Sequence, residues 1–131
     1  MRKLTVMLVD DNPMLLKTVH DLVAGLPHVA RVDCANTGAE VLARIGNLQP
    51  DLVLTDIMMP EMSGFELIRA LRALDNPPRV VAVTLHASPE YRAAALRSGA
   101  EDCISKRDLG TLIPEMIATM AEQANRSVQP V

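Results

Sequence analysis

Short apolar runs and helical patterns alternate along the whole of this 131-residue chain, and this alternation limits the fold more than any other feature. The runs are typical of buried strands because they are short, rich in valine, leucine and isoleucine, and bounded by turn residues. Each run is followed by a helical pattern, so the chain has the order of a parallel sheet with helices on both faces. The five predicted strands are Leu4–Val9, Val29–Ala35, Leu52–Asp56, Val80–Leu85 and Cys103–Ser105.

Local signals mark where four of the five helices begin. Two have a capping side chain followed by proline, and two have a capping box, in which serine or threonine precedes glutamate by three residues. Gly99 is predicted to end the fourth helix in the left-handed conformation. The last helix is expected to be regular only from about Thr111, because Pro114 would clash with the carbonyl of Gly110. The four capping residues are Asn12, Thr37, Ser63 and Ser88.

The length and the 49% apolar composition indicate one globular domain with a substantial core. We expect residues 1–122 to form this domain and residues 123–131, which are mostly polar, to be a flexible tail or the start of a linker to an output domain. Cys34 and Cys103 stand alone, which argues against a zinc site or a disulfide framework. The first apolar run is too short for a membrane span or a signal peptide, so a cytoplasmic location away from membranes is expected.

Charge and composition argue against nucleic-acid binding by this segment. The net charge is −3, whereas phosphate contacts need a clustered basic surface. One tyrosine, one phenylalanine and no tryptophan provide no platform on which bases stack. A nucleotide site is also disfavoured, since no glycine-rich phosphate loop is present.

Polar side chains follow the predicted strands at the points where they end. The carboxyl ends of parallel strands share one edge of the sheet, where such folds bind ligands, so we expect these side chains to meet. Three carboxylates close together require a cation, and oxygen ligands with room for water suit Mg²⁺. A lysine and a hydroxyl beside them complete a site for a phosphoryl group, with Asp56 as the candidate nucleophile. The five residues are Asp10, Asp11, Asp56, Thr84 and Lys106.

From about residue 4 to residue 121, the chain resembles the receiver domain of bacterial two-component response regulators. The resemblance implies a doubly wound α/β fold of the flavodoxin-like, CheY-like type. In that fold five parallel strands lie in the order 2-1-3-4-5 and five helices cover them. The motifs that carry the resemblance are Val9-Asp10-Asp11-Asn12, Asp56-Ile57-Met58-Met59-Pro60 followed by Gly64, Thr84, Gly99-Ala100 and Ser105-Lys106.

The resemblance also implies a phosphoacceptor and a metal site. Asp56 would take a phosphoryl group from a phosphohistidine on a sensor histidine kinase or a phosphotransfer protein. Mg²⁺ would be held by Asp11, Asp56 and the main-chain carbonyl of Met58, with Asp10 in the outer part of the metal site. The protein would thus supply the nucleophile and the metal for its own phosphorylation without being a turnover enzyme.

The remaining site residues are implied to carry the signal. Lys106 and Thr84 would bind phosphoryl oxygens, and movement of Thr84 would change the last strands and helices. Those elements are a possible surface for a homodimer. By analogy, the output is expected to be a C-terminal helix-turn-helix domain that regulates transcription.

The sequence departs from the family pattern beside the predicted site. Leu85 follows Thr84 where a small residue is usual, which predicts tighter access to Asp56. Cys103 stands where the family usually has an aromatic side chain that couples to Thr84, so that coupling is called into question. His86 is expected to be a solvated loop residue rather than a catalytic one.

Two other classes of function remain open. A degenerate receiver would act by protein contacts alone, as Leu85 and Cys103 allow, although the complete set of strand-end residues argues against it. A Mg²⁺-dependent phosphohydrolase would use Asp56 as its nucleophile. Against the hydrolase, Met58 stands where a second acid is expected, and no cap domain accompanies the site.

Overall fold

Five parallel strands form one sheet in the computed structural model, which describes residues 3–85 and 87–128. The strand order is β2-β1-β3-β4-β5, as the family resemblance implies. β4 lies one residue earlier in the chain than predicted, and β5 also begins one residue earlier, which is within the usual variation of strand ends. The strands are β1 Leu4–Val9, β2 Val29–Ala35, β3 Leu52–Asp56, β4 Arg79–Thr84 and β5 Asp102–Ser105.

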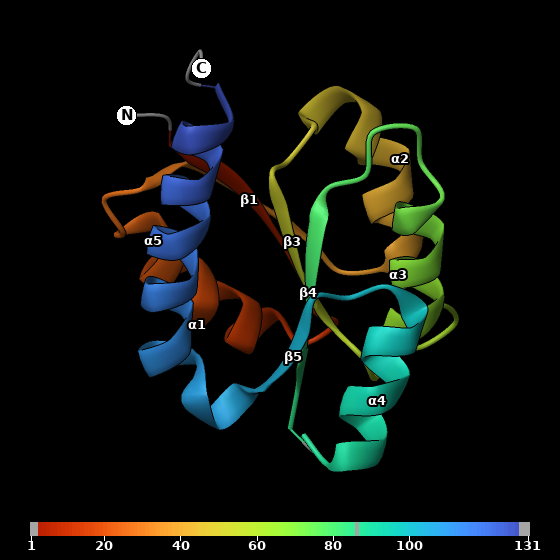
Figure 1. The fold of residues 1–131 in the computed structure, drawn as a ribbon. Helices are drawn as coiled ribbons and strands as arrows, with labels where there is room; N and C mark the ends of the chain where they lie inside the picture. The colour runs from red at the N-terminus through yellow and green to blue at the C-terminus, as the bar shows by residue number, and fades with distance from the viewer. Residues whose placement is uncertain (1–2, 86, 129–131) are drawn as a thin grey trace.

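Helices cover both faces of the sheet, with α1 and α5 on one face and α2, α3 and α4 on the other (Figure 1). All four predicted capping residues accept hydrogen bonds from backbone N–H groups in the first turn of their helices. Gly99 ends α4 with a φ of 117°, the predicted left-handed conformation. The helices are α1 Pro13–Ala24, α2 Gly38–Leu48, α3 Gly64–Arg72, α4 Pro89–Ser98 and α5 Leu109–Val128, and a 3-10 turn, η1 Lys106–Asp108, precedes α5.

The sheet is buried on both sides because its strands are almost entirely apolar. Successive side chains of a strand point to opposite faces, so Met7 and Leu8 enter different cores. Leu8 packs in the core that includes Ile113 of α5, and Met7 packs in the core that includes Leu67 and Leu71 of α3. Full burial of each such side chain contributes about 1.5–3 kcal/mol to the stability of the folded protein. The well-packed sheet is therefore a rigid support for the residues at its carboxyl edge.

The C-terminal helix differs from the sequence prediction at both ends. It is regular from Leu109 rather than from Thr111, and Pro114 lies inside it. Burial of Leu109 and Ile113 offsets the hydrogen bond that the proline removes. Residues 123–128, predicted as flexible tail, continue this helix, and an ion pair within the helix joins Arg126 to Glu122 at 2.6 Å.

Two predictions concern residues that lie outside the described part of the chain. These are the solvated loop position of His86 and the tail at residues 129–131. The boundary between a domain and a linker therefore stays a prediction. Within the described residues, none of the helices is both long enough and apolar enough to cross a membrane.

Candidate functional site

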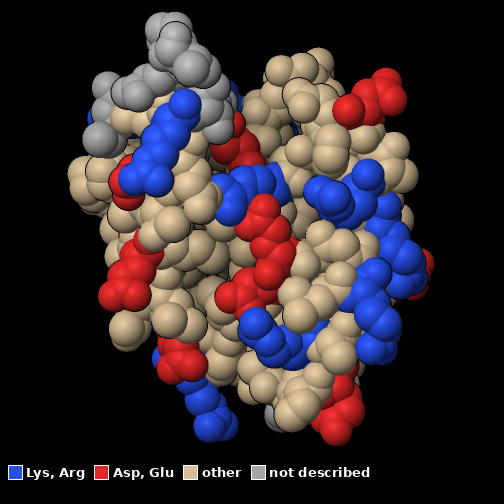
Figure 2. Space-filling view, in the orientation of Figure 1, with Lys and Arg blue, Asp and Glu red and all other residues tan. Residues whose placement is uncertain are grey.

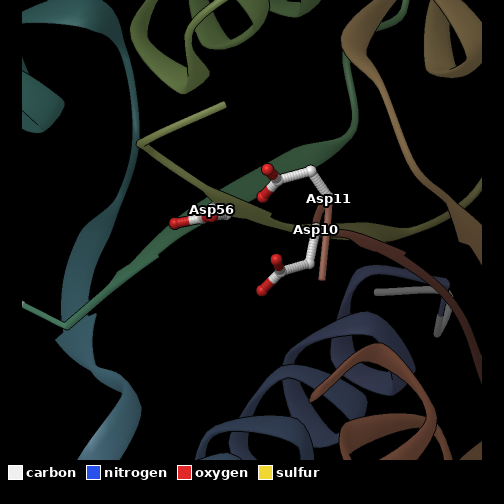
Figure 3. A group of neighbouring side chains, drawn as sticks. All are labelled: Asp10, Asp11 and Asp56. Carbon is white, nitrogen blue, oxygen red and sulfur yellow. The ribbon is translucent and has the colours of Figure 1, made fainter. Parts of the chain in front are cut away.

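The three predicted acidic residues meet at the carboxyl edge of the sheet. Asp10 and Asp11 directly follow β1, and Asp56 is the last residue of the neighbouring strand β3. One carboxylate oxygen from each lies within 4.8 Å of the others, and Figure 3 shows the three side chains beside one another. Asp10 and Asp56 are buried, whereas Asp11 is exposed. The convergence expected from the sequence is therefore confirmed for all three residues.

Lys106 brings a positive charge to this cluster from the end of β5, which is the edge strand next to β4. Its Nζ lies 3.0 Å from Oδ2 of Asp10 and 3.4 Å from Oδ2 of Asp56. All three side chains are no more than 10% exposed, so water screens these ion pairs little. One ammonium thus bridges two carboxylates, and three negative charges face one positive charge.

Thr84 lies at the same edge, as the last residue of β4. β4 pairs with β3 through Val83 and Asp56, and with β5 through Thr84 and Ser105. Thr84 is only 1% exposed. The pairing therefore places this buried hydroxyl residue between the strand that carries Asp56 and the strand that precedes Lys106.

Backbone N–H groups hold both buried carboxylates. The N–H of Asn12 donates to Oδ1 of Asp10 at 2.9 Å, and the N–H of Met58 donates to Oδ1 of Asp56 at 3.4 Å. Because each acid also has an oxygen near Lys106, its orientation is fixed from two sides. The sequence alone identified these acids but gave no signal for the backbone donors.

Gly64 allows α3 to approach β3, the strand that ends in Asp56. A Cβ atom at this position would lie 2.2 Å from the main-chain oxygen of Asp56 and 2.6 Å from Cα of Ile57. The N–H of Gly64 also donates to the carbonyl of Ile57 at 2.8 Å, which closes the loop after β3. This glycine belongs to the family motif, and the close approach of the Asp56 and Ile57 main chain leaves no space for a side chain there.

Burial and charge repulsion both act on Asp56. Burial raises the pKa of its carboxyl group, and the negative charge of Asp10 raises it further, while Lys106 lowers it in part. The ionised cluster therefore costs free energy in the folded protein. Carboxylate oxygens are the ligands that a hard divalent cation prefers, so the residues present fit such an ion and would gain from it.

Exposure differs among three side chains beside the predicted site, those of Leu85, Met58 and Cys103. Leu85 is 59% exposed and Met58 is 61% exposed, so both side chains flank the site at the surface. Cys103 is buried on β5 at 4% exposure. The tighter access expected from Leu85 stays a prediction.

A sequence model of the response regulator receiver domain matches residues 6–117. The chain belongs to this family. Receiver domains act in two-component systems through phosphorylation, with histidine kinases or phosphotransfer proteins as partners. The receiver described here is thus a signalling domain, as the strand-end residues and the strand order both indicate.

Similar proteins contain this receiver as one part of a longer chain. It is 32% identical to the protein-glutamate methylesterase/protein-glutamine glutaminase 3 of Geobacter sulfurreducens over 131 residues, which is 34% of that protein. It is 30% identical to the sensor histidine kinase RcsC of Escherichia coli over 122 residues, or 93% of this chain and 13% of that protein. The chain therefore spans about a third or less of these relatives.

The structure also matches an isolated receiver. The signal receiver domain of the response regulator NarL from Mycobacterium tuberculosis is 30% identical and superposes with a TM-score of 0.84. The match covers 93% of this chain and 98% of that one. Sequence and structure comparisons therefore agree on the family.

Adding a methyl group at Gly64 should disturb the site through the backbone. We expect Gly64→Ala to lower the free energy of unfolding by about 2 kcal/mol or more, because the new Cβ meets main-chain atoms that cannot move independently. Gly46→Ala is the matched control, since a Cβ in that part of α2 meets nothing within 4 Å. This control should be stabilised by up to about 1 kcal/mol. Urea unfolding measures both, and equal stability of the two variants would contradict the interpretation.

The raised pKa of Asp56 predicts a pH-dependent gain in stability for Asp56→Asn. A carboxyl whose pKa is higher in the folded state than in the unfolded state opposes folding once it is ionised. Without divalent cations, the variant should be more stable than the wild type at pH 7 by on the order of 1 kcal/mol. The gain should vanish below about pH 4, where the wild-type carboxyl is protonated in both states.

Thermal unfolding across this pH range tests the expectation. Asp21→Asn is the control, because Asp21 is exposed and its pKa is lowered by hydrogen bonds from Lys17 and His20. This control should show no gain at pH 7. A destabilised Asp56→Asn at pH 7 would mean that the contact with Lys106 outweighs burial and repulsion.

Proposed function

We propose that this receiver takes a phosphoryl group onto Asp56 from a phosphohistidine on a sensor histidine kinase or phosphotransfer protein. The observation that carries this proposal is the placement of Lys106, whose Nζ lies 3.4 Å from Oδ2 of Asp56 within an acidic cluster. A lysine in that position offsets the charge of an incoming phosphoryl group. Its presence beside a buried carboxylate fits an acceptor better than a purely structural ion pair.

In the proposed step, a carboxylate oxygen of Asp56 attacks phosphorus as the bond from phosphorus to the histidine nitrogen breaks. The nitrogen keeps the electron pair of that bond, and the donor histidine, which carries a proton on its other ring nitrogen, leaves as a neutral imidazole. Lys106 and Thr84 then donate hydrogen bonds to the phosphoryl oxygens. The phosphoryl group places new negative charge at the ends of β4 and β5, which is the event that changes the conformation.

Mg²⁺ is the proposed cofactor of this step. Asp11, Asp56 and the main-chain carbonyl of Met58 would hold it, with Asp10 in the outer part of the site. When bound, the ion reduces the repulsion between an anionic acceptor and an anionic donor. The exposed position of Asp11 suits a ligand that takes up an ion from solution.

The proposal extends to the surroundings of the receiver. We place it in the cytoplasm, and its two free cysteines support a reducing compartment. We expect this segment not to bind nucleic acid itself and to control a C-terminal helix-turn-helix domain. Leu96 of α4 and Leu112 of α5 are 41% and 37% exposed, which supports a homodimer through the last strands and helices.

Intact-mass measurement with a small acyl-phosphate donor tests the acceptor role. We expect a single phosphoryl adduct that requires Mg²⁺, is absent from Asp56→Asn and is retained by Asp75→Asn, an exposed acid outside the cluster. Absence of an adduct despite Mg²⁺ binding would favour action by protein contacts alone. Sustained turnover of phosphate esters would favour a phosphohydrolase instead.

Binding of Mg²⁺ should raise the stability of the folded protein. A ligand present at one hundred times its dissociation constant stabilises the folded state by about 2.7 kcal/mol. Saturating Mg²⁺ should therefore raise the melting temperature of the wild type, and Asp11→Asn should lose most of that increase. Asp75→Asn should keep it. The metal site is contradicted if Asp11→Asn responds to Mg²⁺ as the wild type does.

A further inference from the structure

Small side chains make up the inner face of α4. The buried residues of this helix are Ala95 and Ser98, whereas α3 buries Leu67, Ile68 and Leu71. Burial of apolar area scales with side-chain size, so the hydrophobic effect holds α4 more weakly than α3. Polar and aromatic contacts must therefore contribute a larger share of its attachment.

Arg92 joins α4 to β5 through two hydrogen bonds. Its Nη1 donates to a carboxylate oxygen of Asp102 and, at 3.3 Å, to the main-chain carbonyl of Cys103. We call these two hydrogen bonds the Arg92 bridge. They end on the strand that leads directly to Lys106, and they start on the helix that follows the loop after Thr84.

The Arg92 bridge closes a loop that contains one site residue, Thr84, and ends beside a second, Lys106. The chain runs from Thr84 at the end of β4 into α4, and α4 lies beside β5 (Figure 1). Thr84 pairs with Ser105, the residue before Lys106. A shift of Thr84 toward a phosphoryl group on Asp56 would act on α4 along the chain, whereas the Arg92 bridge would hold α4 to β5.

We propose that the Arg92 bridge favours the unphosphorylated state and so sets how readily the receiver switches. This inference rests on the proposed function. The structure that contains the bridge also has Lys106 paired with the carboxylates of Asp10 and Asp56 themselves. Cys103 lacks the aromatic ring that the family usually has at this position, and Arg92 links α4 to the main chain here.

Binding of beryllofluoride, a mimic of the phosphoryl group, in the presence of Mg²⁺ tests the proposal. An interaction that stabilises only the unliganded state lowers the affinity for the mimic, so removing it raises that affinity. Half-exposed ion pairs contribute at most about 1 kcal/mol, so Arg92→Met should bind the mimic about two- to fivefold more tightly than the wild type. Titration calorimetry measures this change.

Two further variants separate the bridge from a general effect on α4. Arg97→Met removes an arginine of the same helix for which the described residues provide no carboxylate partner, and its affinity should equal that of the wild type. Asp102→Asn should tighten binding like Arg92→Met, since it removes the charge at the other end of the bridge. The double variant should add little to either change.

The outcomes distinguish this inference from the proposed function. Tighter binding by Arg92→Met and Asp102→Asn, but not by Arg97→Met, supports the bridge. Equal or weaker binding by Arg92→Met overturns it while leaving the acceptor role intact. Failure of the wild type to bind the mimic at all overturns both proposals.

Tyrosine fluorescence provides an independent measure of α4. Tyr91 is the one tyrosine of a chain without tryptophan, and it stacks on Phe65 of α3 with ring centroids 6.4 Å apart. Binding of the mimic should change its emission if α4 moves. The change should reach half its size at a lower beryllofluoride concentration in Arg92→Met, and an unchanged emission in the wild type would contradict movement of α4.

Discussion

Repulsion among the carboxylates of Asp10, Asp11 and Asp56 is the interaction on which the rest of this structure depends. The acids come from two adjacent strands, so no local segment can keep them together. A sheet buried on both faces supplies the rigid support, and Lys106 supplies the opposing charge from the end of another strand. The structure thus tolerates an unfavourable charge cluster that a metal ion and a phosphoryl group would use.

This arrangement of acids lowers the stability of the folded protein. A buried carboxylate near a second acid resists ionisation, yet the ionised form is the one that the proposed phosphoryl transfer requires. The backbone donors to Asp10 and Asp56 keep both groups in place without neutralising them. The close approach of Gly64 restricts the main chain of Asp56, which helps to hold its carboxyl group in one position.

Contacts between α4 and β5 lie next to the site. Where the family usually has an aromatic side chain, Cys103 is small and buried, and Arg92 reaches its carbonyl from α4. Helix α4 buries only small side chains, so apolar contacts contribute little to its attachment. Elements that move during signalling have such low local stability. In the proposed switch, the charged bridge and the aromatic contact of Phe65 with Tyr91 oppose movement of this helix.

The sequence by itself determined the alternation of strands and helices, the caps at residues such as Ser63, and the edge where the site lies. These features depend on periodicity and on neighbours within a few residues, which a sequence displays directly. Tertiary structure decided the rest. Burial of Leu109 and Ile113 allowed α5 to begin early despite Pro114, and packing of Gly64 and the reach of Arg92 join segments distant in the chain. Such contacts leave no local pattern, because they exist only once the folded chain brings these segments together.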